Sequence, residues 1–366
     1  MEQLTDAQEM LEMVDRPAFY VKDGTVVLVN SAAKGLLIEP GTAVSGLLAT
    51  GAEEYAAFEG GQLYLTLSIG GVSMGACVTR MEHFDTFRLE DGADHSELQA
   101  MALAARELRD PLTSIMITAQ RLFPVSEATD DPTVREQVAR INRGLYQMLR
   151  VINNMSDAVQ YSAASESGAV IATDRQELLN ITAELAEITA KAAALVEQTG
   201  RTLHYHGIPD DIYSLADREK LERAVLNMIS NAMKFTPAGS TITVTLTKRG
   251  SKLYLCVQDN GPGIDETVRT NVFTRYQRQS ALEDGRFGIG LGMVLIRAAA
   301  AVHGGTVLVD QPVGGGTRIT MSLAIRQHTT GQLRNRILRV DYAGERDHGL
   351  IELSDILPAA LYEKEN

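Results

Sequence analysis

Cysteine is almost absent from this chain of 366 residues, which contains only Cys77 and Cys256. Two distant cysteines exclude a disulfide framework, and without a CxxC pair the usual spacing of a zinc site is missing. No apolar run approaches ~18 residues, so no transmembrane helix is expected. The opening MEQLTDAQEM is polar and acidic, unlike a signal peptide. Together these absences predict a cytoplasmic protein in a reducing compartment.

Positive charge is also in the minority, with 34 Lys and Arg against 47 Asp and Glu and a formal net charge of −13. An acidic chain is repelled by phosphate backbones, so no nucleic-acid partner is expected. Hydrophobic residues make up 45% of the chain. At ~100–200 residues per domain, this length predicts two or three domains with their own cores. We expect an α+β multidomain protein.

Residues 1–90 read as a small α+β domain. Two apolar runs flank the pair Asp23-Gly24, which is a strong signal for a β-hairpin. The stretch PAFYVKDGTVVLVNSAAKGLL, in which Asn30 leads into a helix, resembles the opening of a PAS domain. That resemblance implies a PAS-like sensor, and the alternative is another kind of small α+β domain.

Residues 91–164 carry an apolar seam in each half, with spacings that alternate between three and four. The seam residues are Leu98, Met101, Ala105, Leu108, Leu112, Ile115, Ala119 and Leu122, then Val134, Val138, Ile141, Leu145, Met148, Ile152, Met155 and Val159. The turn-forming segment PVSEATDDP separates the halves, and Pro132 suits the first position of a helix. We therefore expect an antiparallel helical hairpin. One hairpin cannot bury such a seam, whereas two hairpins form a four-helix bundle in a homodimer; the alternative is packing on another domain of the same chain.

Residues 170–326 mix predicted helices and strands, which fits an α/β sandwich. The predicted helices span residues 174–198, 217–234 and 291–303, and the predicted strands span residues 240–248, 252–258, 305–309 and 317–323. The last strands alternate apolar and polar residues, as half-buried antiparallel strands do. The C-terminal extension, residues 327–366, is expected to add a strand at 336–340 and a helix, and no chemistry is assigned to it.

The segment NMISNAMKFTP begins at Asn227 and places polar groups on one helix face. Asn227 and Asn231 are four residues apart, so both amides point the same way. An amide oxygen is a hard neutral ligand that suits Mg²⁺. Lys234 lies one turn further along and can reach a phosphate as a point charge. Such pairs are often only solvent-facing, so this segment alone is weak.

Three further clusters follow it. In DNGPGI, Asp259 follows an apolar strand and can accept a hydrogen bond from an exocyclic amine such as that of adenine, while Gly261 and Gly263 allow close backbone approach. VFTRYQR occupies residues 272–278. GRFGIGLG, residues 285–292, opens a helix whose free N–H groups can bind phosphate.

In this order, the four clusters resemble the N, G1, F and G2 boxes of the histidine-kinase catalytic domain, of the GHKL type. The resemblance implies ATP and Mg²⁺ as cofactors. The implied roles are Asn231 for Mg²⁺, Asn227 and Lys234 for phosphate, Asp259 for the adenine amine with Gly261, Gly263 and Ile264 beside it, Phe273 and Tyr276 for a mobile lid, and Gly288, Gly290 and Leu291 for capping the phosphates. Arg286 and Phe287 depart from the family, which has Gly and a small residue there.

The segment ARELRDPLTSI, which starts at residue 105, resembles the H-box of the same family, except that Arg106 stands where the phosphoacceptor histidine is expected. Guanidinium is protonated at all working pH values and offers no lone pair for attack on phosphorus. Glu107 occupies the place of the acidic residue that assists proton removal. Asp110 replaces the Thr or Asn with which some members position water, so phosphatase activity is also doubtful.

The leading hypothesis is a dimeric, cytoplasmic signalling protein of two-component systems that binds Mg-ATP but does not autophosphorylate. Its partners would be a response regulator or an active kinase. One alternative is an active kinase that phosphorylates a histidine on a partner chain, and another is an ATP-gated binding module without phosphotransfer. A fourth is that Arg106 is a sequencing or engineered change from histidine, in which case the natural protein is an ordinary sensor kinase.

Overall fold

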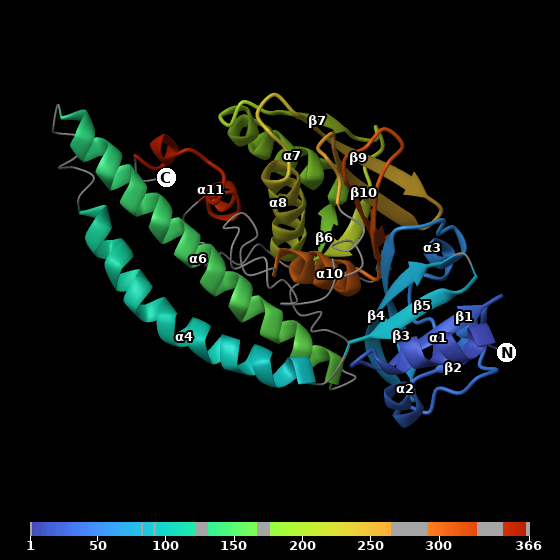
Figure 1. Ribbon diagram of the computed structural model, residues 1–366. Coiled ribbons are helices and arrows are strands. Elements are labelled where there is room, and N and C mark those ends of the chain that lie inside the picture. The colour runs from blue at the N-terminus through green and yellow to red at the C-terminus, as the bar shows by residue number, and fades with distance from the viewer. Residues whose placement is uncertain are drawn as a thin grey trace.

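The computed structural model describes residues 2–81, 83–90, 93–121, 131–166, 176–264, 291–327 and 347–363. A long helical hairpin lies beside an α/β unit, and the N-terminal residues form a second, smaller α/β unit (Figure 1). None of the helices in these ranges is long and apolar enough to cross a membrane. The expected mixture of helical and α/β parts is therefore present.

The N-terminal unit is an antiparallel sheet with short helices around it. Its elements are α1 (Glu2–Glu12), β1 (Ala18–Lys22), β2 (Thr25–Val29), α2 (Ser31–Gly35), the 3-10 turn η1 (Val44–Gly46), α3 (Ala52–Ala56), β3 (Gln62–Ile69), β4 (Val72–Arg80) and β5 (Asp85–Leu89). The predicted hairpin is confirmed, because β1 pairs with β2 and both Asp23 and Gly24 have positive φ. Asn30 is buried, and its Oδ1 accepts from the backbone N–H of Ala33 and of Ala18. This side chain thereby caps α2 and ties it to β1.

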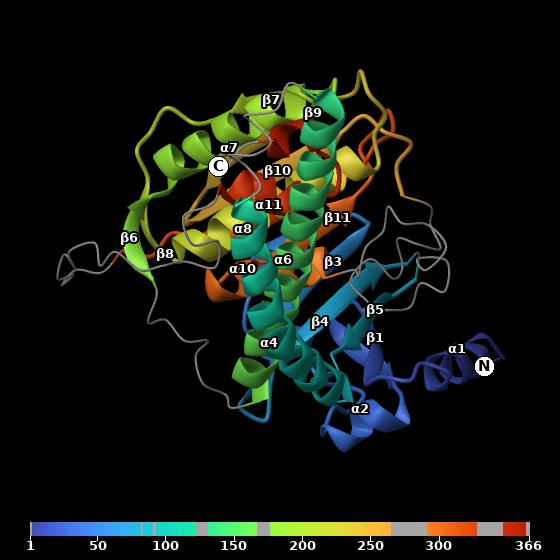
Figure 2. The ribbon, with the colours of Figure 1, turned by 90° about the vertical axis from the view of Figure 1, so that its left-hand side faces the viewer.

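The predicted helical hairpin is confirmed and consists of α4 (Ala93–Gln120) and α6 (Pro132–Glu166), which run side by side (Figures 1 and 2). Helix α6 begins at Pro132 as expected, and Asp131 Oδ1 accepts from Thr133 N–H at 2.8 Å. It runs to Glu166, two residues past the predicted end of the hairpin. Pro111 lies inside α4, where it removes one backbone donor.

Only half of the predicted apolar seam is covered within the chain. The buried members are Ala105, Leu112 and Ala119 of α4 and Leu145, Ile152 and Met155 of α6. The exposed members, spaced by seven within each helix, are Leu108 (50%), Ile115 (51%), Val134 (38%), Ile141 (49%) and Met148 (46%). The described part of the hairpin thus buries one row of its seam and leaves most of the second row facing outward, with Met155 as the buried exception.

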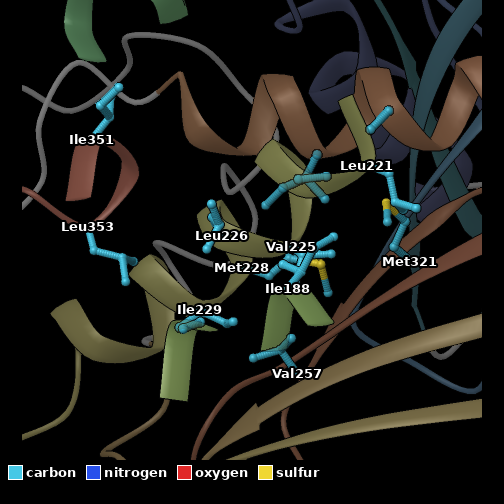
Figure 3. Packing of buried hydrophobic residues seen from close by; sticks show 14 of the residues in the cluster. Ile188, Leu221, Val225, Leu226, Met228, Ile229, Val257, Met321, Ile351 and Leu353 are labelled. Carbon is cyan, nitrogen blue, oxygen red and sulfur yellow. The ribbon is translucent and has the colours of Figure 1, made fainter. Parts of the chain in front are cut away.

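The larger α/β unit follows the hairpin. Its elements are β6 (Glu177–Asn180), α7 (Ile181–Glu197), β7 (Thr202–His206), β8 (Tyr213–Ala216), α8 (Arg218–Lys234), β9 (Thr241–Arg249), β10 (Lys252–Asp259), α10 (Gly292–Val302), β11 (Val307–Asp310) and β12 (Arg318–Ala324). Asp217 caps α8 by accepting from Lys220 N–H at 3.1 Å. The apolar face of α8 packs toward Val257 of β10 and Met321 of β12 (Figure 3). These helices layered on a sheet confirm the α/β architecture.

The prediction of a helix from residue 174 is wrong for residues 177–180, which form β6 and pair with β8. Asn180 ends the strand and starts the helix, because its Oδ1 accepts from Ala183 N–H at 3.2 Å. Strand β7 is a second difference. No strand was predicted at Thr202–His206, and β7 pairs in parallel with β9.

One sheet of ten strands joins the two α/β units, in the order β2-β1-β5-β4-β3-β11-β12-β10-β9-β7. The junction is the antiparallel pair of β3 with β11, where Leu63 faces Leu308. Glu54 of α3 reaches across it to Lys252 at 2.7 Å, and Arg297 of α10 contacts Glu90 at 3.0 Å. The smaller unit is therefore attached through both backbone and side-chain contacts.

The C-terminal segment, residues 347–363, lies between α6 and α8 (Figures 1 and 2). It contains the expected helix, here the short α11 (His348–Glu352), and the 3-10 turn η4 (Ala359–Tyr362). Ile351, Leu353, Leu357 and Tyr362 are fully buried in the core that also contains residues of α6 and α8. The predicted strand at 336–340 lies outside the described residues.

Candidate functional site

Helix α8 carries three of the predicted site residues along one side. Asn227 is only 1% exposed, and its Nδ2 donates to Arg223 O at 2.8 Å. Asn231, one turn on, is half-buried, and its Nδ2 lies 3.7 Å from Met293 Sδ. Lys234 is the last residue of the helix. The spacing of four and three residues thus places two amides and one ammonium in a row.

Asp259, the last residue of β10, is 5% exposed. Its Oδ1 accepts from the backbone N–H groups of Gly261 at 2.8 Å and Thr317 at 3.2 Å. Burial raises the pKa of this carboxyl, and the two backbone donors oppose that shift. The side chain is therefore oriented through one oxygen and can offer the other to a donor on a ligand.

The loop after Asp259 lies against the end of α8. A Cβ at Gly261 would come within 2.9 Å of Phe235 O, and a Cβ at Gly263, whose φ is +81°, would come within 2.6 Å of Gln311 Nε2. A larger residue at Gly261 would push the loop away from the end of α8, whereas Gly263 is favoured by its positive φ and its close approach to the segment after β11. Ile264 is half-buried beside the main core.

The start of α10 completes the described part of the site. Leu291 is buried and precedes Gly292, the first residue of the helix. A Cβ at Gly292 would lie 3.2 Å from Asn227 Oδ1 and 3.8 Å from Asn231 Oδ1. The helix N-terminus, with its free N–H groups, is thus directed at the two amides.

The structure brings together the first two predicted clusters and the end of the fourth, Leu291 and Gly292. Phe273, Tyr276, Gly288 and Gly290, together with the unusual pair Arg286 and Phe287, lie outside the described residues. The residues that are present fit a purine nucleotide, since a buried carboxylate lies at one end and amides, a lysine and a helix N-terminus lie at the other. A magnesium ion fits the amide oxygen of Asn231 beside such phosphates.

Arg106 and Glu107 are both exposed on α4. Helix α4 packs along α6, on the side that faces away from α8 (Figure 1). Arg109 of the same segment is also exposed, and its Nη2 donates to Asn153 Oδ1 of α6 at 3.4 Å. The H-box-like segment and the candidate nucleotide site are therefore on opposite sides of α6.

Four charged residues around α8 were not expected from the sequence. Glu352 of α11 is fully buried and accepts from Arg223 Nε at 2.9 Å and from Asn227 Nδ2 at 3.1 Å. Asp355 contacts Lys234 Nζ at 2.7 Å and Arg150 Nη1 at 2.6 Å. For Glu352 and Asp355, the only sequence signal was the apolar spacing in GLIELSDIL, residues 349–357. That spacing indicates that the segment packs on something, but it does not indicate which element it packs on.

Electrostatics at Lys234 follow from these contacts. Burial and the nearby Arg150 lower the pKa of Lys234, and Asp355 opposes the shift. Burial alone would raise the pKa of the Asp355 carboxyl, but Arg150 and Lys234 outweigh it and hold that pKa below its usual value. The ion pair is partly buried, since the side chain of Lys234 is 12% exposed and that of Asp355 is 35% exposed.

Two family models match the chain. Residues 216–327 match the histidine kinase-, DNA gyrase B- and HSP90-like ATPase, and residues 96–163 match the His Kinase A (phospho-acceptor) domain. The fold and site thus define an ATPase-type domain joined to a phosphoacceptor-type hairpin. The chain belongs to the sensor histidine kinase family.

Among the relatives, the histidine protein kinase DivJ of Caulobacter vibrioides is 30% identical over 255 residues, which cover 64% of this chain and 40% of DivJ. The adaptive-response sensory kinase SasA of Crocosphaera subtropica is 29% identical over 237 residues, which cover 62% of this chain and 59% of SasA. The chain therefore spans less than two thirds of the length of these relatives.

Solved structures of kinases are also similar to it. Full-length ShkA in complex with AMPPNP is 21% identical with a TM-score of 0.47, over 63% of this chain and 47% of ShkA. A solved chain of the mycobacterial sensor histidine kinase MprB is 26% identical with a TM-score of 0.35, over 42% of this chain and 99% of that solved chain.

Proposed function

We propose that this protein is a cytoplasmic, homodimeric member of two-component signalling systems that binds Mg-ATP and does not autophosphorylate at residue 106. The observation that carries the nucleotide site is the meeting of Asp259, the row on α8 and the start of α10. ATP would supply a transferable γ-phosphoryl group there.

The proposed roles follow the geometry. Asp259 accepts from the adenine amine, because its buried carboxylate is oriented by two backbone donors. Asn231 offers its amide oxygen to Mg²⁺, and Asn227 and Lys234 face the phosphates. The lid and cap roles of Phe273, Tyr276, Gly288, Gly290 and Leu291 remain as the family resemblance implies them.

The absence of autophosphorylation rests on Arg106. Its side chain is exposed at the acceptor position, so a kinase domain could reach it, but a guanidinium has no free lone pair for attack on phosphorus. It can only attract a phosphoryl group electrostatically. Glu107 would then have no imidazole proton to accept, and Asp110 would repel an incoming phosphoryl group.

Homodimerisation is supported by the exposed half of the seam. Leu108 and Ile115 on α4, and Ile141 and Met148 on α6, recur every seven residues and remain about half exposed. A second hairpin would cover both rows in a four-helix bundle. This arrangement would leave Arg106 on the outside, where a response regulator or an active partner kinase could bind.

The N-terminal unit is proposed to be a PAS-like sensor. Support comes from the β1–β2 hairpin and from Asn30, which links that hairpin to α2 through its side chain. Its core is separate from the core of the larger unit. A ligand or partner signal received there could reach the ATP-binding unit through the paired strands β3 and β11.

The test is phosphate transfer from γ-labelled ATP with Mg²⁺, scored as acid-labile label on the protein. The natural chain and an Arg106→Gln control should remain unlabelled, whereas Arg106→His should gain label. Label on the natural chain would overturn the proposal and direct mapping first to His95, which also lies on α4. Label on a complete kinase hairpin added to the natural chain would favour the second candidate, an active kinase that acts on a partner histidine.

A further inference from the structure

We propose that residues 347–363 are an internal ligand of the nucleotide site, an acidic latch whose docking and nucleotide binding exclude each other. The inference rests on the proposed function, because it concerns the same site. We call these residues the latch.

The latch places two carboxylates where the proposed site would receive phosphate. Glu352 Oε2 accepts from Asn227 Nδ2 at 3.1 Å, and Asp355 Oδ2 lies 2.7 Å from Lys234 Nζ. A phosphate oxygen would use the same amide N–H and the same ammonium, because both anions are recognised by charge-assisted hydrogen bonds. One donor set cannot serve both at once.

Together with α6 of the hairpin, the latch also covers the part of the site around Asn227. Arg150 of α6 has its Nη2 3.4 Å from Asn227 Oδ1 and its Nε 3.4 Å from Glu352 Oε2. Arg223 of α8 bonds Glu352, donates to Asn154 Oδ1 at 2.7 Å and pairs with Asp157. Asn227 is consequently sealed between α6, α8 and the latch, as its 1% exposure shows.

One face of α6 holds the latch in place independently of the carboxylates. Arg143 donates to Ser354 O at 3.0 Å and to Asp355 O at 2.9 Å. Asn142 Nδ2 donates to Tyr362 O at 3.0 Å, and Gln147 Nε2 donates to Ser354 O at 3.2 Å. The rings of Tyr146 and Tyr362 meet edge to face at 5.1 Å. These contacts allow the latch to be loosened without touching the proposed phosphate-facing residues.

A tethered segment competes effectively, because its local concentration is set by the chain and not by mixing. The apparent association constant for nucleotide equals the intrinsic constant multiplied by the fraction of molecules in which the latch is released. A smaller released fraction therefore means weaker apparent binding. By reciprocity, bound nucleotide must promote release of the latch by the same factor.

The decisive variant is Arg143→Ala, with Arg140→Ala as its matched control. Arg140 lies three residues earlier on α6, pairs with Glu136, and carries the same charge. Without a latch, removing the positive charge of Arg143 can only weaken binding of an anion. If the latch competes, Arg143→Ala should bind AMPPNP with Mg²⁺ about tenfold more tightly than the natural chain, and Arg140→Ala should match the natural chain. Titration calorimetry on the full chain measures this.

A second variant, Tyr362→Phe, changes no charge and removes only the hydrogen bond from Tyr362 OH to Leu350 O at 2.7 Å. It should tighten AMPPNP binding in the same direction. In the natural chain, saturating AMPPNP should accelerate hydrogen exchange at the amides of Leu353 and Leu357, which bond within the latch.

The outcomes separate the two proposals. Equal or weaker binding by Arg143→Ala, with unchanged exchange in the latch, overturns the latch and leaves the nucleotide site standing. If neither the natural chain nor the loosened variants bind AMPPNP, both the nucleotide site and the latch are wrong. Thermal melts of each variant verify that the rest of the chain remains folded.

Discussion

At the residue scale, His303 shows how a buried polar side chain can set the pH dependence of folding. Its Nε2 accepts from Asp217 N–H at 3.0 Å, and its Nδ1 lies 2.6 Å from Ala299 O, to which it donates in the neutral tautomer. Burial lowers the pKa of this imidazole. Protonation would place a second proton against the N–H of Asp217, the capping residue of α8.

The folded pKa of His303 is below the unfolded value of ~6.5, so the unfolded chain binds the proton more readily. The stability that neutral His303 contributes is fully present above ~pH 6.5 and is lost as the pH falls through the folded pKa. We predict that the free energy of unfolding, measured with urea between pH 7.5 and pH 5, falls less steeply in His303→Gln than in the natural chain. His204→Gln, at an exposed position of β7, should retain the natural slope; equal slopes in all three proteins would contradict the prediction.

At the element scale, the hairpin provides a matched pair of isoleucines. Ile115 lies on the exposed row with Leu108, whereas Ile117 is equally exposed at 51% but lies off that row. A charge in a bundle core is costly, because it loses its hydration without gaining a partner. If the chain forms the proposed homodimer, Ile115→Asp should convert it to a monomer in light scattering, and Ile117→Asp should remain dimeric. A dimer in both variants would show that another surface holds the chains together.

The sequence predicted the elements whose local signals are strong. Asp217, the Asn pair and Lys234 indicated the full length of α8, and the Asp-Gly pair indicated the first hairpin. It missed β6, because a four-residue strand with only one buried side chain carries no clear period. It could not show which half of the seam would remain exposed, because this depends on the partner helix and not on the spacing.

The sequence predicted the residues of the candidate site only within single segments of the chain, and not the contacts between segments. The Asn spacing and the glycines are local, so the sequence indicated them. The contacts of Glu352 with Asn227 and of Asp355 with Lys234 join residues more than a hundred positions apart. An acidic residue in a C-terminal extension is most often solvated, and no local pattern distinguishes a buried one. The latch therefore required the structure.

At the scale of the whole molecule, Glu54 joins the smaller α/β unit to the larger one. Its carboxylate contacts Lys252 Nζ at 2.7 Å, Ser322 Oγ at 3.0 Å and Tyr254 OH at 3.3 Å. Glu54→Gln would leave the ammonium of Lys252 without its countercharge in a mostly buried place. We expect a loss of roughly 2 kcal/mol in the free energy of unfolding, less than for a fully buried pair.

The same variant should accelerate hydrogen exchange in β3 and β11, where the two units meet. Glu53→Gln, one residue earlier on α3 and exposed, is the matched control and should change neither quantity. An unchanged exchange rate at β3 and β11 in Glu54→Gln would mean that the backbone pairing alone holds the units together.

The pairing of β3 with β11 also bears on how such chains can be recombined. A domain that is joined to its neighbour only by a flexible linker can be exchanged for another domain. Here, by contrast, residues 62–64 pair with residues 307–309 in one continuous sheet. A chimera that replaces residues 1–90 with an unrelated domain would leave β11 as an exposed edge strand with unpaired backbone groups. Such an edge promotes self-association. A segment of this protein that is transferred into another chain should therefore include both α/β units, so that the pairing of β3 with β11 is kept.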